Sequence, residues 1–234
     1  MNQTVSDNLT VGEIVTNDFR TSIVFKNAGI DFCCGGKQTI EEACREKGIN
    51  QKSLEKELNE LGQQNFPSHN FKEWDPAFLS DYIVNTHHKF VRKHLPELLF
   101  YTGKIATVHG ENHPELIEVA ELFEEMNKEL TQHLQNEEEV LFPAIKKTLN
   151  NPSRESKKTI HSDIERMFGE HDFAGGAMDK INRLTKNYQI PEDACKTYEV
   201  TLKLLQQFED DLHVHVHLEN NILFPKALNL AGGN

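Results

Sequence analysis

The segment HLQNEEEVLFP, residues 133–143, recurs as HVHLENNILFP at residues 215–225. Both copies have the form His-x3-Glu-x3-Leu-Phe-Pro, and they lie 82 positions apart. Because a helix turns about 100° per residue, side chains that are four positions apart share one face of it. Each copy therefore presents one imidazole and one carboxylate to the same side of a helix. These side chains are His133, Glu137, His215 and Glu219.

Two further histidines repeat at nearly the same separation. His88 and His171 are 83 positions apart, and each is followed two residues later by a phenylalanine. The order along the chain is therefore His, His-x3-Glu, His, His-x3-Glu, which predicts a pseudo-twofold site for two metal ions. Each histidine would bind one ion, and Glu137 and Glu219 could bridge the pair. Nitrogen and oxygen ligands of this kind favour iron or manganese.

The helical period dominates the chain from Pro76 onward. We expect four long helices, joined by short breaks that imply antiparallel neighbours and hence a four-helix bundle. Proline should kink the first helix at Pro96, and should kink or end the second and fourth at Pro143 and Pro225. The expected helices cover residues 76–108, 114–149, 154–187 and 191–229.

Every candidate ligand occupies a position on the apolar stripe of its helix. His88, for example, lies between Val84 and Val91. A bare carboxylate in a bundle core costs several kcal/mol, and a buried histidine needs a partner. A lone histidine on such a stripe is usually a hydrogen-bonded core residue, but four in register with two glutamates favour cations among them.

Other histidines near the stripes are weaker candidates. His213 and His217 form an i,i+4 pair that could bind a metal by itself. His109 continues the first stripe and could be a further ligand, although a histidine at the C-terminal end of a helix is the simpler interpretation. His94 falls off the stripe, and we expect it at the surface.

Three acidic residues lie beside the candidate ligands. We expect Glu138 and Glu139 on a solvated face, whereas Glu170 could line an access path to the metals. None of them belongs to the predicted ligand set.

Residues 1–62 are expected to form a small domain of three short helices. These are Asp18–Ala28, Thr39–Lys47 and Gln51–Leu61, each followed by glycine, which suits a helix C-terminus. Thr39 and Glu42 form a capping-box pair. Residues 63–75 contain turn formers without periodicity and are expected to link this domain to the bundle of residues 76–234.

The four cysteines do not have the spacing of a zinc site or a disulfide framework. Cys33 and Cys34 are adjacent, in a glycine-bounded turn, and adjacent residues cannot easily offer both sulfurs to one tetrahedral ion. They are either inert turn residues or an exposed pair that is redox-active or binds metal with a partner's sulfurs. Cys44 and Cys195 are expected to pack between helices.

Charge and composition exclude several classes of partner. The 234 residues carry a formal net charge of −12 and contain no block rich in lysine and arginine, which argues against nucleic acid and anionic membranes as partners. The polar start, residues 1–7, does not resemble a signal peptide, and no apolar run is long enough to cross a membrane. We therefore expect a cytoplasmic protein.

Residues 76–229 resemble the hemerythrin-like proteins, helical bundles that hold a non-haem di-iron centre. Oxygen-carrying hemerythrins use an extra histidine where this chain repeats His-x3-Glu. The repeated His/His-x3-Glu pattern follows an N-terminal segment that contains GIDFCCGG at 29–36 and TIEEAC at 39–44. With both features, nearly the whole chain resembles the iron–sulfur cluster repair di-iron proteins. The segments HGENHP at 109–114 and HVHLEN at 215–220 are similar to the Gram-positive members of that family.

This resemblance implies a site of two iron ions, oxo-bridged when oxidised. It implies a bacterial homodimer, induced by oxidative or nitrosative stress, which restores damaged iron–sulfur clusters by donating iron. Damaged cluster proteins would be its partners, and nitric oxide or oxygen its small ligands. Cys33 and Cys34 would then supply electrons or hold iron in transit. Two alternatives stay open: a di-iron reductase of nitric oxide or peroxide, and a sensor of oxygen or nitric oxide.

Overall fold

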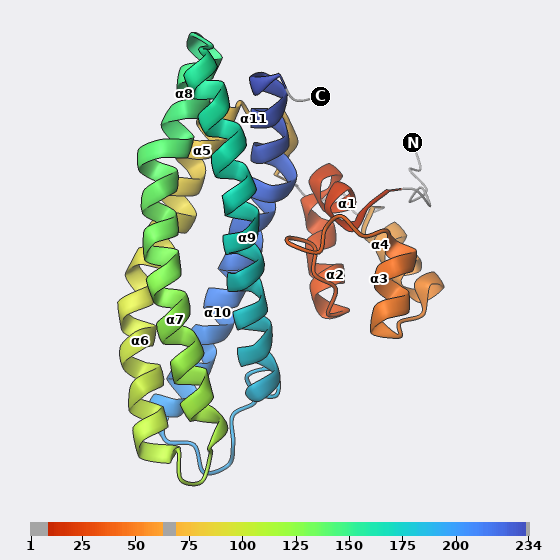
Figure 1. Ribbon diagram of the computed structural model, residues 1–234. Coiled ribbons are helices and arrows are strands. Elements are labelled where there is room, and N and C mark those ends of the chain that lie inside the picture. Colours follow the sequence, from red (N-terminus) through yellow and green to blue (C-terminus); the bar gives the residue numbers. More distant parts are fainter. Residues whose placement is uncertain (1–8, 63–68, 233–234) are drawn as a thin grey trace.

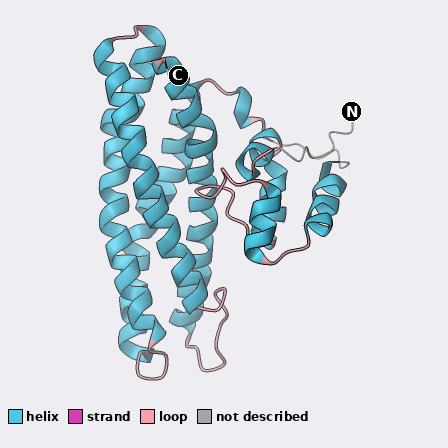
Figure 2. Ribbon diagram, turned by 45° about the vertical axis from the view of Figure 1, so that its right-hand side comes forward, coloured by secondary structure: helices cyan, strands magenta, loops and turns pink. Residues whose placement is uncertain are grey.

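The computed structural model describes residues 9–62 and 69–232. Within these ranges the chain is helical, apart from turns, loops and one isolated β-bridge between Thr10 and Thr39. Figures 1 and 2 show a long helical bundle with a smaller group of helices beside it. The polar start at 1–7, residues 63–68 of the expected linker and residues 233–234 lie outside the described ranges.

The bundle is formed by four antiparallel rods, as the helical period predicts (Figure 1). The first, second and fourth rods each consist of two α-helices joined by a π-helical turn, whereas the third rod is a single α-helix. In chain order, the elements are α5 (Pro76–Ile83), η3 (Val84–His88) and α6 (Lys89–His109), then α7 (Glu115–Asn136), η4 (Glu137–Leu141) and α8 (Phe142–Asn150), then α9 (Arg154–Leu184), and last α10 (Lys196–Leu218), η5 (Glu219–Leu223) and α11 (Phe224–Ala231).

The π-helical turns were not expected from the sequence, and they coincide with the motif. In η4 the backbone N–H of Phe142 bonds to the carbonyl of Glu137, five residues earlier, and in η5 Phe224 bonds to Glu219 in the same way. Such turns insert an extra residue into a helix and are frequent at functional sites. Both candidate bridging glutamates therefore begin a π-helical turn.

The prolines fit these interruptions only in part. Pro143 and Pro225 lie in the first turn of α8 and α11, directly after a π-helical turn, where a missing N–H is tolerated. Neither proline ends its rod, since α8 and α11 continue to Asn150 and Ala231. In the first rod, by contrast, α6 continues without a break through Pro96.

The fourth rod begins at Lys196, later than the expected residue 191. Helix α9 ends at Leu184, and the next residues include three consecutive non-glycine residues with positive φ. This left-handed backbone cannot continue into a right-handed helix. These residues are Lys186, Asn187 and Tyr188, with φ of 50°, 60° and 57°.

The N-terminal helices follow the expected pattern, with one addition. Helices α2 (Ser22–Asn27), α3 (Ile40–Lys47) and α4 (Gln51–Gly62) correspond to the three expected ones. The capping box between Thr39 and Glu42 is present, and Gly48 adopts φ of 67° after the end of α3. Helix α1 (Val11–Asn17) was not expected; it starts at a second capping box, between Thr10 and Glu13.

The N-terminal helices pack directly against the bundle and share a hydrophobic cluster with it. Buried residues of that cluster come from both parts, for example Phe32 and Val216. The side-chain amide of Asn221, in η5, donates hydrogen bonds to the carbonyl oxygens of Phe32 and Cys33 at 3.2 and 3.3 Å. Figure 1 shows these helices beside α9, α10 and α11. The loop containing the adjacent cysteines is therefore held against the bundle.

Candidate metal centre

The six side chains singled out by the motif meet inside the bundle. They come from all four rods and are at most 2% exposed. None could satisfy its polar atoms with water, so the cost of burying them must be met by one another or by cations. They are His88 (η3), His133 (α7), Glu137 (η4), His171 (α9), His215 (α10) and Glu219 (η5).

Their ligand atoms form two overlapping groups. One group contains His88 and His215, the other His133 and His171, and both contain the same two carboxylates; within each group the ligand atoms lie within 4.8 Å of one another. In the first group, His215 Nε2 lies 3.1 Å from a carboxylate oxygen of Glu219. Two cations could therefore sit side by side, each next to two imidazoles, with both carboxylates shared.

Each shared carboxylate faces imidazoles of both groups. An oxygen of Glu137 lies 3.4 Å from His88 Nε2 and 3.3 Å from His133 Nε2. The oxygens of Glu219 face His215 and, at 3.3 Å, His171 Nε2. This arrangement is the one that bridging carboxylates need.

The residues fit a bound cation because their facing atoms are incompatible unless positive charge, from a metal ion or a proton, lies between them. His133 Nε2 and His171 Nε2 lie 3.1 Å apart. The Nδ1 atom of each ring faces an acceptor oxygen and therefore carries the proton, so two bare nitrogens of neutral rings would face each other. Both oxygens of Glu137 and Nε2 of His88 also lack a hydrogen-bond partner. Positive charge at this point resolves all of these conflicts.

The pKa values of these groups show the same demand for positive charge. Burial alone would lower the pKa of His88, but Glu137 and Glu219 raise it to about 10. Burial and the charge of Glu219 would raise the pKa of Glu137, yet His133 and His88 lower it to about 2. The carboxylates thus remain ionised and attract protons onto His88 and His133, whose pKa values are both raised to about 10, when no metal ion competes for them.

Each motif copy also orients the lone histidine of a neighbouring rod. Directly after Glu137, Glu138 accepts a hydrogen bond from His88 Nδ1 at 2.8 Å. Directly after Glu219, Asn220 accepts one from His171 Nδ1 at 2.8 Å. A hydrogen bond at Nδ1 fixes the tautomer that leaves Nε2 free for a metal.

The phenylalanine of each motif copy stacks on the same histidine. The ring of Phe142 lies 5.7 Å from that of His88, and the ring of Phe224 lies 5.8 Å from that of His171, with interplanar angles of 22° and 1°. The Glu-Glu and Glu-Asn pairs and the following phenylalanines therefore hold two imidazoles in place. The pseudo-twofold repeat of the sequence is also a repeat of these contacts.

The two histidines within the motif copies are held differently. His133 Nδ1 contacts Glu170 at 2.6 Å, so Glu170 orients a candidate ligand, although the sequence suggested an access path. His215 Nδ1 has no hydrogen-bond partner, and its ring stacks on that of His87, 5.6 Å away with an interplanar angle of 9°. The pseudo-symmetry is therefore incomplete at His215.

The structure corrects two expectations about residues near the stripes. Glu138 was expected on a solvated face, but its side chain is only 29% exposed and contacts His88; Glu139 is exposed as expected. His94 was expected at the surface, but it is buried, since it packs on the ring of Phe90 and contacts Glu97.

The remaining histidines lie outside the two groups. His217 is buried, with Nδ1 near the Phe32 carbonyl and Asn221, and it shares no candidate metal group with His213 within the described ranges. His109 lies at the end of α6, with Nε2 3.1 Å from the sulfur of Cys195. Cys195 itself is exposed at the start of α10, which contradicts its expected packing role, whereas Cys44 is buried as expected.

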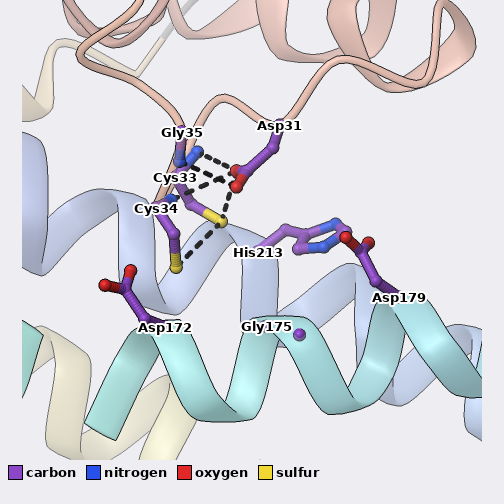
Figure 3. Close-up of a pocket in the computed structure, with 9 residues that line it drawn as sticks. Asp31, Cys33, Cys34, Gly35, Asp172, Gly175, Asp179 and His213 are labelled. Atoms are coloured by element: carbon purple, nitrogen blue, oxygen red, sulfur yellow. Dashed lines mark hydrogen bonds between the residues drawn. The ribbon is translucent and has the colours of Figure 1, made fainter. Parts of the chain in front are cut away.

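The adjacent cysteines lie outside the six-residue cluster, in a pocket next to it. Cys33 is buried and Cys34 half-buried, and their sulfurs are 4.0 Å apart on the same side of the turn (Figure 3). This corrects the expectation that neighbouring residues cannot easily direct both sulfurs to one point. A hydrogen bond with Cys34, burial and the charge of Asp31 all raise the pKa of the Cys33 thiol well above its usual range, which disfavours a reactive nucleophile.

No described helix is both long enough and apolar enough to cross a bilayer.

Two family matches cover most of the chain. Residues 80–227 match the hemerythrin HHE cation-binding domain, and residues 7–62 match ScdA_N, a domain of unknown function. An antiparallel bundle with a buried cluster of histidine and glutamate, matched over this length, defines a hemerythrin-like, cation-binding protein.

Full-length relatives narrow the class further. The chain is 36% identical over 217 residues to the iron–sulfur cluster repair protein ScdA of Staphylococcus haemolyticus, covering 92% of this chain and 96% of that protein. It is 38% identical over 209 residues to a probable iron–sulfur cluster repair protein of Haemophilus influenzae, covering 88% and 90%. To the repair protein YtfE of an Enterobacter species it is 34% identical over 221 residues, covering 93% and 96%. The chain belongs to this family of iron–sulfur cluster repair proteins.

Proposed function

We propose that this protein holds two iron ions in the bundle and uses them to restore iron–sulfur clusters damaged by oxidative or nitrosative stress. The observation that carries the proposal is the sharing of Glu137 and Glu219 between two histidine pairs. A mononuclear site would need only one of these groups. The family of repair proteins supplies the biological context for the pair of sites.

The donor set supports iron as the metal. Four imidazoles and two carboxylates are of intermediate to hard character, which suits iron and manganese and disfavours copper(I). When bound, iron would supply a cation that exists in two oxidation states and can be passed to another site. The protein contributes the oriented imidazoles of His88 and His171 and the exclusion of water by the surrounding core.

The charge of the cluster supports iron donation. Two carboxylates offer two negative charges to two cations, and the four imidazoles are neutral when they bind metal. A site with only two anionic ligands binds two divalent cations less tightly than a thiolate-rich site would. The residues thus suit a store from which iron can be released after reduction, and the comparisons favour repair over the reductase and sensor alternatives.

The proposal can be tested with purified, iron-loaded protein. It is reduced without oxygen and mixed with an iron–sulfur enzyme whose cluster has been damaged by peroxide. We expect activity to return in proportion to the iron lost from this protein, and we expect Glu137→Ala/Glu219→Ala to abolish both. Loss of no iron, together with no recovered activity, would contradict iron donation. The variant Glu139→Ala, at an exposed neighbouring position, is the matched control.

We further propose two domains, residues 1–62 and 76–234, with 63–75 as the linker. The separate family matches at 7–62 and 80–227 support this division. We also propose a cytoplasmic homodimer that meets damaged cluster proteins as partners and nitric oxide or oxygen as small ligands. The resemblance to the repair family supports these proposals, and light scattering of the purified chain tests the dimer.

A further inference from the structure

The turn that contains the adjacent cysteines has the properties of a second cation site. We propose that Cys33, Cys34 and Asp31 bind one thiophilic divalent cation, of the ferrous or cobaltous type, where the N-terminal helices contact the bundle. This inference deepens the proposed function and rests on it only for the identity of the natural cargo.

The spacing of the two sulfurs suits chelation. Cys33 Sγ and Cys34 Sγ are 4.0 Å apart. Two thiolates that bind one tetrahedral cation at about 2.3 Å each lie about 3.8 Å from one another. A shift of a few tenths of an ångström would therefore bring both sulfurs onto one ion. The ligand atoms of Cys33, Cys34 and Asp31 already lie within 4.8 Å of one another.

The carboxylate of Asp31 is fixed in position by the turn. It accepts backbone N–H groups from Cys33 at 2.7 Å, from Cys34 at 3.1 Å and from Gly35 at 2.7 Å. The thiol of Cys33 also donates to Asp31 Oδ1, at 3.0 Å. Figure 3 shows these bonds converging on the carboxylate. A proton now lies between sulfur and carboxylate, where a shared cation would replace it.

The surroundings of the turn attract cations. The pocket has a volume of about 310 Å³, and no lysine or arginine lines it. Asp172 and Asp179 of α9 and His213 of α10 form the wall opposite the cysteines (Figure 3). With Asp31, three carboxylates surround the opening, which raises the local concentration of divalent cations.

The bundle is shaped to bring this turn close to the metal centre. The thiol of Cys34 donates to the backbone carbonyl of His171 at 3.4 Å, and His171 is one of the six clustered residues. A Cβ atom at Gly175, one turn further along α9, would lie only 3.3 Å from Cys34 Sγ. The absence of a side chain at Gly175 therefore provides the space that Cys34 Sγ occupies. The second site would lie between the centre and solvent, as a station for iron leaving or entering the bundle.

Binding at this site requires no oxidant or reductant. The cation keeps its oxidation state and loses bound waters as two sulfur–metal bonds and one bond to an Asp31 oxygen form, and the two thiol protons pass to solvent. The negative charge gained by the thiolates offsets the charge of the ion.

Cobalt(II) tests the site without interference from the bundle centre. The six clustered residues contain no sulfur, so a thiolate-to-cobalt charge-transfer band in the near ultraviolet can come only from cysteine. Reduced, metal-free, full-length protein is titrated with cobalt(II) under anaerobic conditions. We expect a thiolate band whose final intensity corresponds to one cobalt bound by two thiolates per chain, in addition to the cobalt that the bundle centre takes up. Wild-type protein that binds cobalt without any thiolate band would overturn the proposal.

Two double variants locate the sulfurs. Cys33→Ser/Cys34→Ser is expected to lose the band, and Cys44→Ser/Cys195→Ser, which keeps only the adjacent pair, is expected to retain it. A band that survives in the first variant would overturn the proposal. Circular dichroism checks that each variant is folded, and the single change Cys34→Ser, at a half-buried side chain, is expected to weaken the band without removing the fold.

The same proteins separate this site from the repair function. A thiolate band in wild-type protein that restores no clusters would support the second site and contradict repair. Restoration of clusters by wild-type protein without a thiolate band would overturn the second site and leave repair intact.

Discussion

His88 and Glu138 lie 50 positions apart in sequence, and Glu138 Oε1 accepts the hydrogen bond of His88 Nδ1 at 2.8 Å. Glu138 also contacts Arg92, so its carboxylate is held from two sides. Since a carboxylate can only accept, Nδ1 of His88 carries a proton, and Nε2 is the ring atom that faces Glu137 and is available to a metal ion. A residue outside the predicted ligand set thus fixes the orientation of His88, a candidate ligand.

Removal of this hydrogen bond should weaken metal binding. We expect Glu138→Ala to lower metal affinity by about 10- to 100-fold, the range typical of a lost bond to a ligating imidazole. Competition with a chelator of known affinity measures the change. Glu139→Ala removes the exposed neighbour and should bind as wild type does. Equal affinities in the two variants would show that Glu138 does not orient His88.

Close packing of α9 against the cysteine turn makes Gly175 sensitive to substitution. In Gly175→Val the added carbons would meet Cys34 Sγ, since even a Cβ atom comes within 3.3 Å of it. We expect the turn to move outward and Cys34 to be alkylated severalfold faster, as read by mass mapping of labelled peptides. Gly169→Val is the same change on the same helix, where a Cβ atom meets nothing within 4 Å. Faster labelling in both variants would point to a general loosening of α9 instead.

Cys195 should be the most reactive thiol of the chain. Hydrogen bonds from the backbone of Tyr198 and from His109 lower the pKa of this exposed thiol. A hydrogen bond with Cys34 together with burial raises the pKa of Cys33, and burial raises that of Cys44. A lowered pKa means more thiolate at neutral pH, so alkylation should begin at a lower pH than at an ordinary cysteine.

The variant His109→Ala checks this explanation of Cys195. Without the imidazole the pKa of Cys195 should rise, and the pH profile of its alkylation should shift toward higher pH. His161→Ala, a histidine distant from Cys195 in sequence and at an exposed position, is the control. An unchanged profile in His109→Ala would mean that the helix N-terminus alone sets the reactivity.

The left-handed segment after α9 stores backbone strain that glycine would relieve. Lys186 is exposed and has φ of 50°, a conformation that costs a residue with a Cβ atom about 1–2 kcal/mol. We expect Lys186→Gly to raise the free energy of unfolding by roughly 1 kcal/mol, after the entropy cost of glycine is subtracted.

A lysine within α9 gives the matched control for this prediction. Lys158→Gly, at an exposed helical position, should lower the free energy of unfolding by about 1 kcal/mol. Denaturant unfolding measures both variants. Destabilisation of similar size at the two positions would contradict the strain at Lys186.

The long helices and the motif could be predicted from sequence because both depend on local periodicity. The prediction that His133 and Glu137 share one face requires only that their segment be helical. The same prediction for His215 and Glu219 requires only that the motif recur in an equivalent rod. The structure brings all six residues of the two repeats together. Their role as metal ligands stays a prediction.

The supporting contacts could not be predicted in the same way because they join distant residues. Glu138 lies in a run of glutamates that predicts a solvated face, and only the packing of the second rod against the first turns it toward His88. A comparison of the two motif copies offers a signal: Glu138 and Asn220 occupy equivalent positions, and both can accept a hydrogen bond. The π-helical turns at Glu137 and Glu219 have no such local signal.

Shorter elements were missed for a different reason. Helix α1 has only seven residues and contains valine and isoleucine, which suit strands as well as helices. Its capping box, Thr10 with Glu13, was the available signal. The direction of the two sulfurs at Cys33 and Cys34 depends on the turn that Asp31 organises. The periodicity of the sequence does not predict the geometry of such a turn.

The central claim is that two iron ions lie between the four imidazoles and share two carboxylates. Anomalous diffraction at the iron absorption edge, from crystals of the iron-loaded protein, tests it most directly. We expect two anomalous peaks, one beside His88 and His215 and the other beside His133 and His171, with Glu137 and Glu219 between them. A single peak, or peaks outside this cluster, would contradict the account.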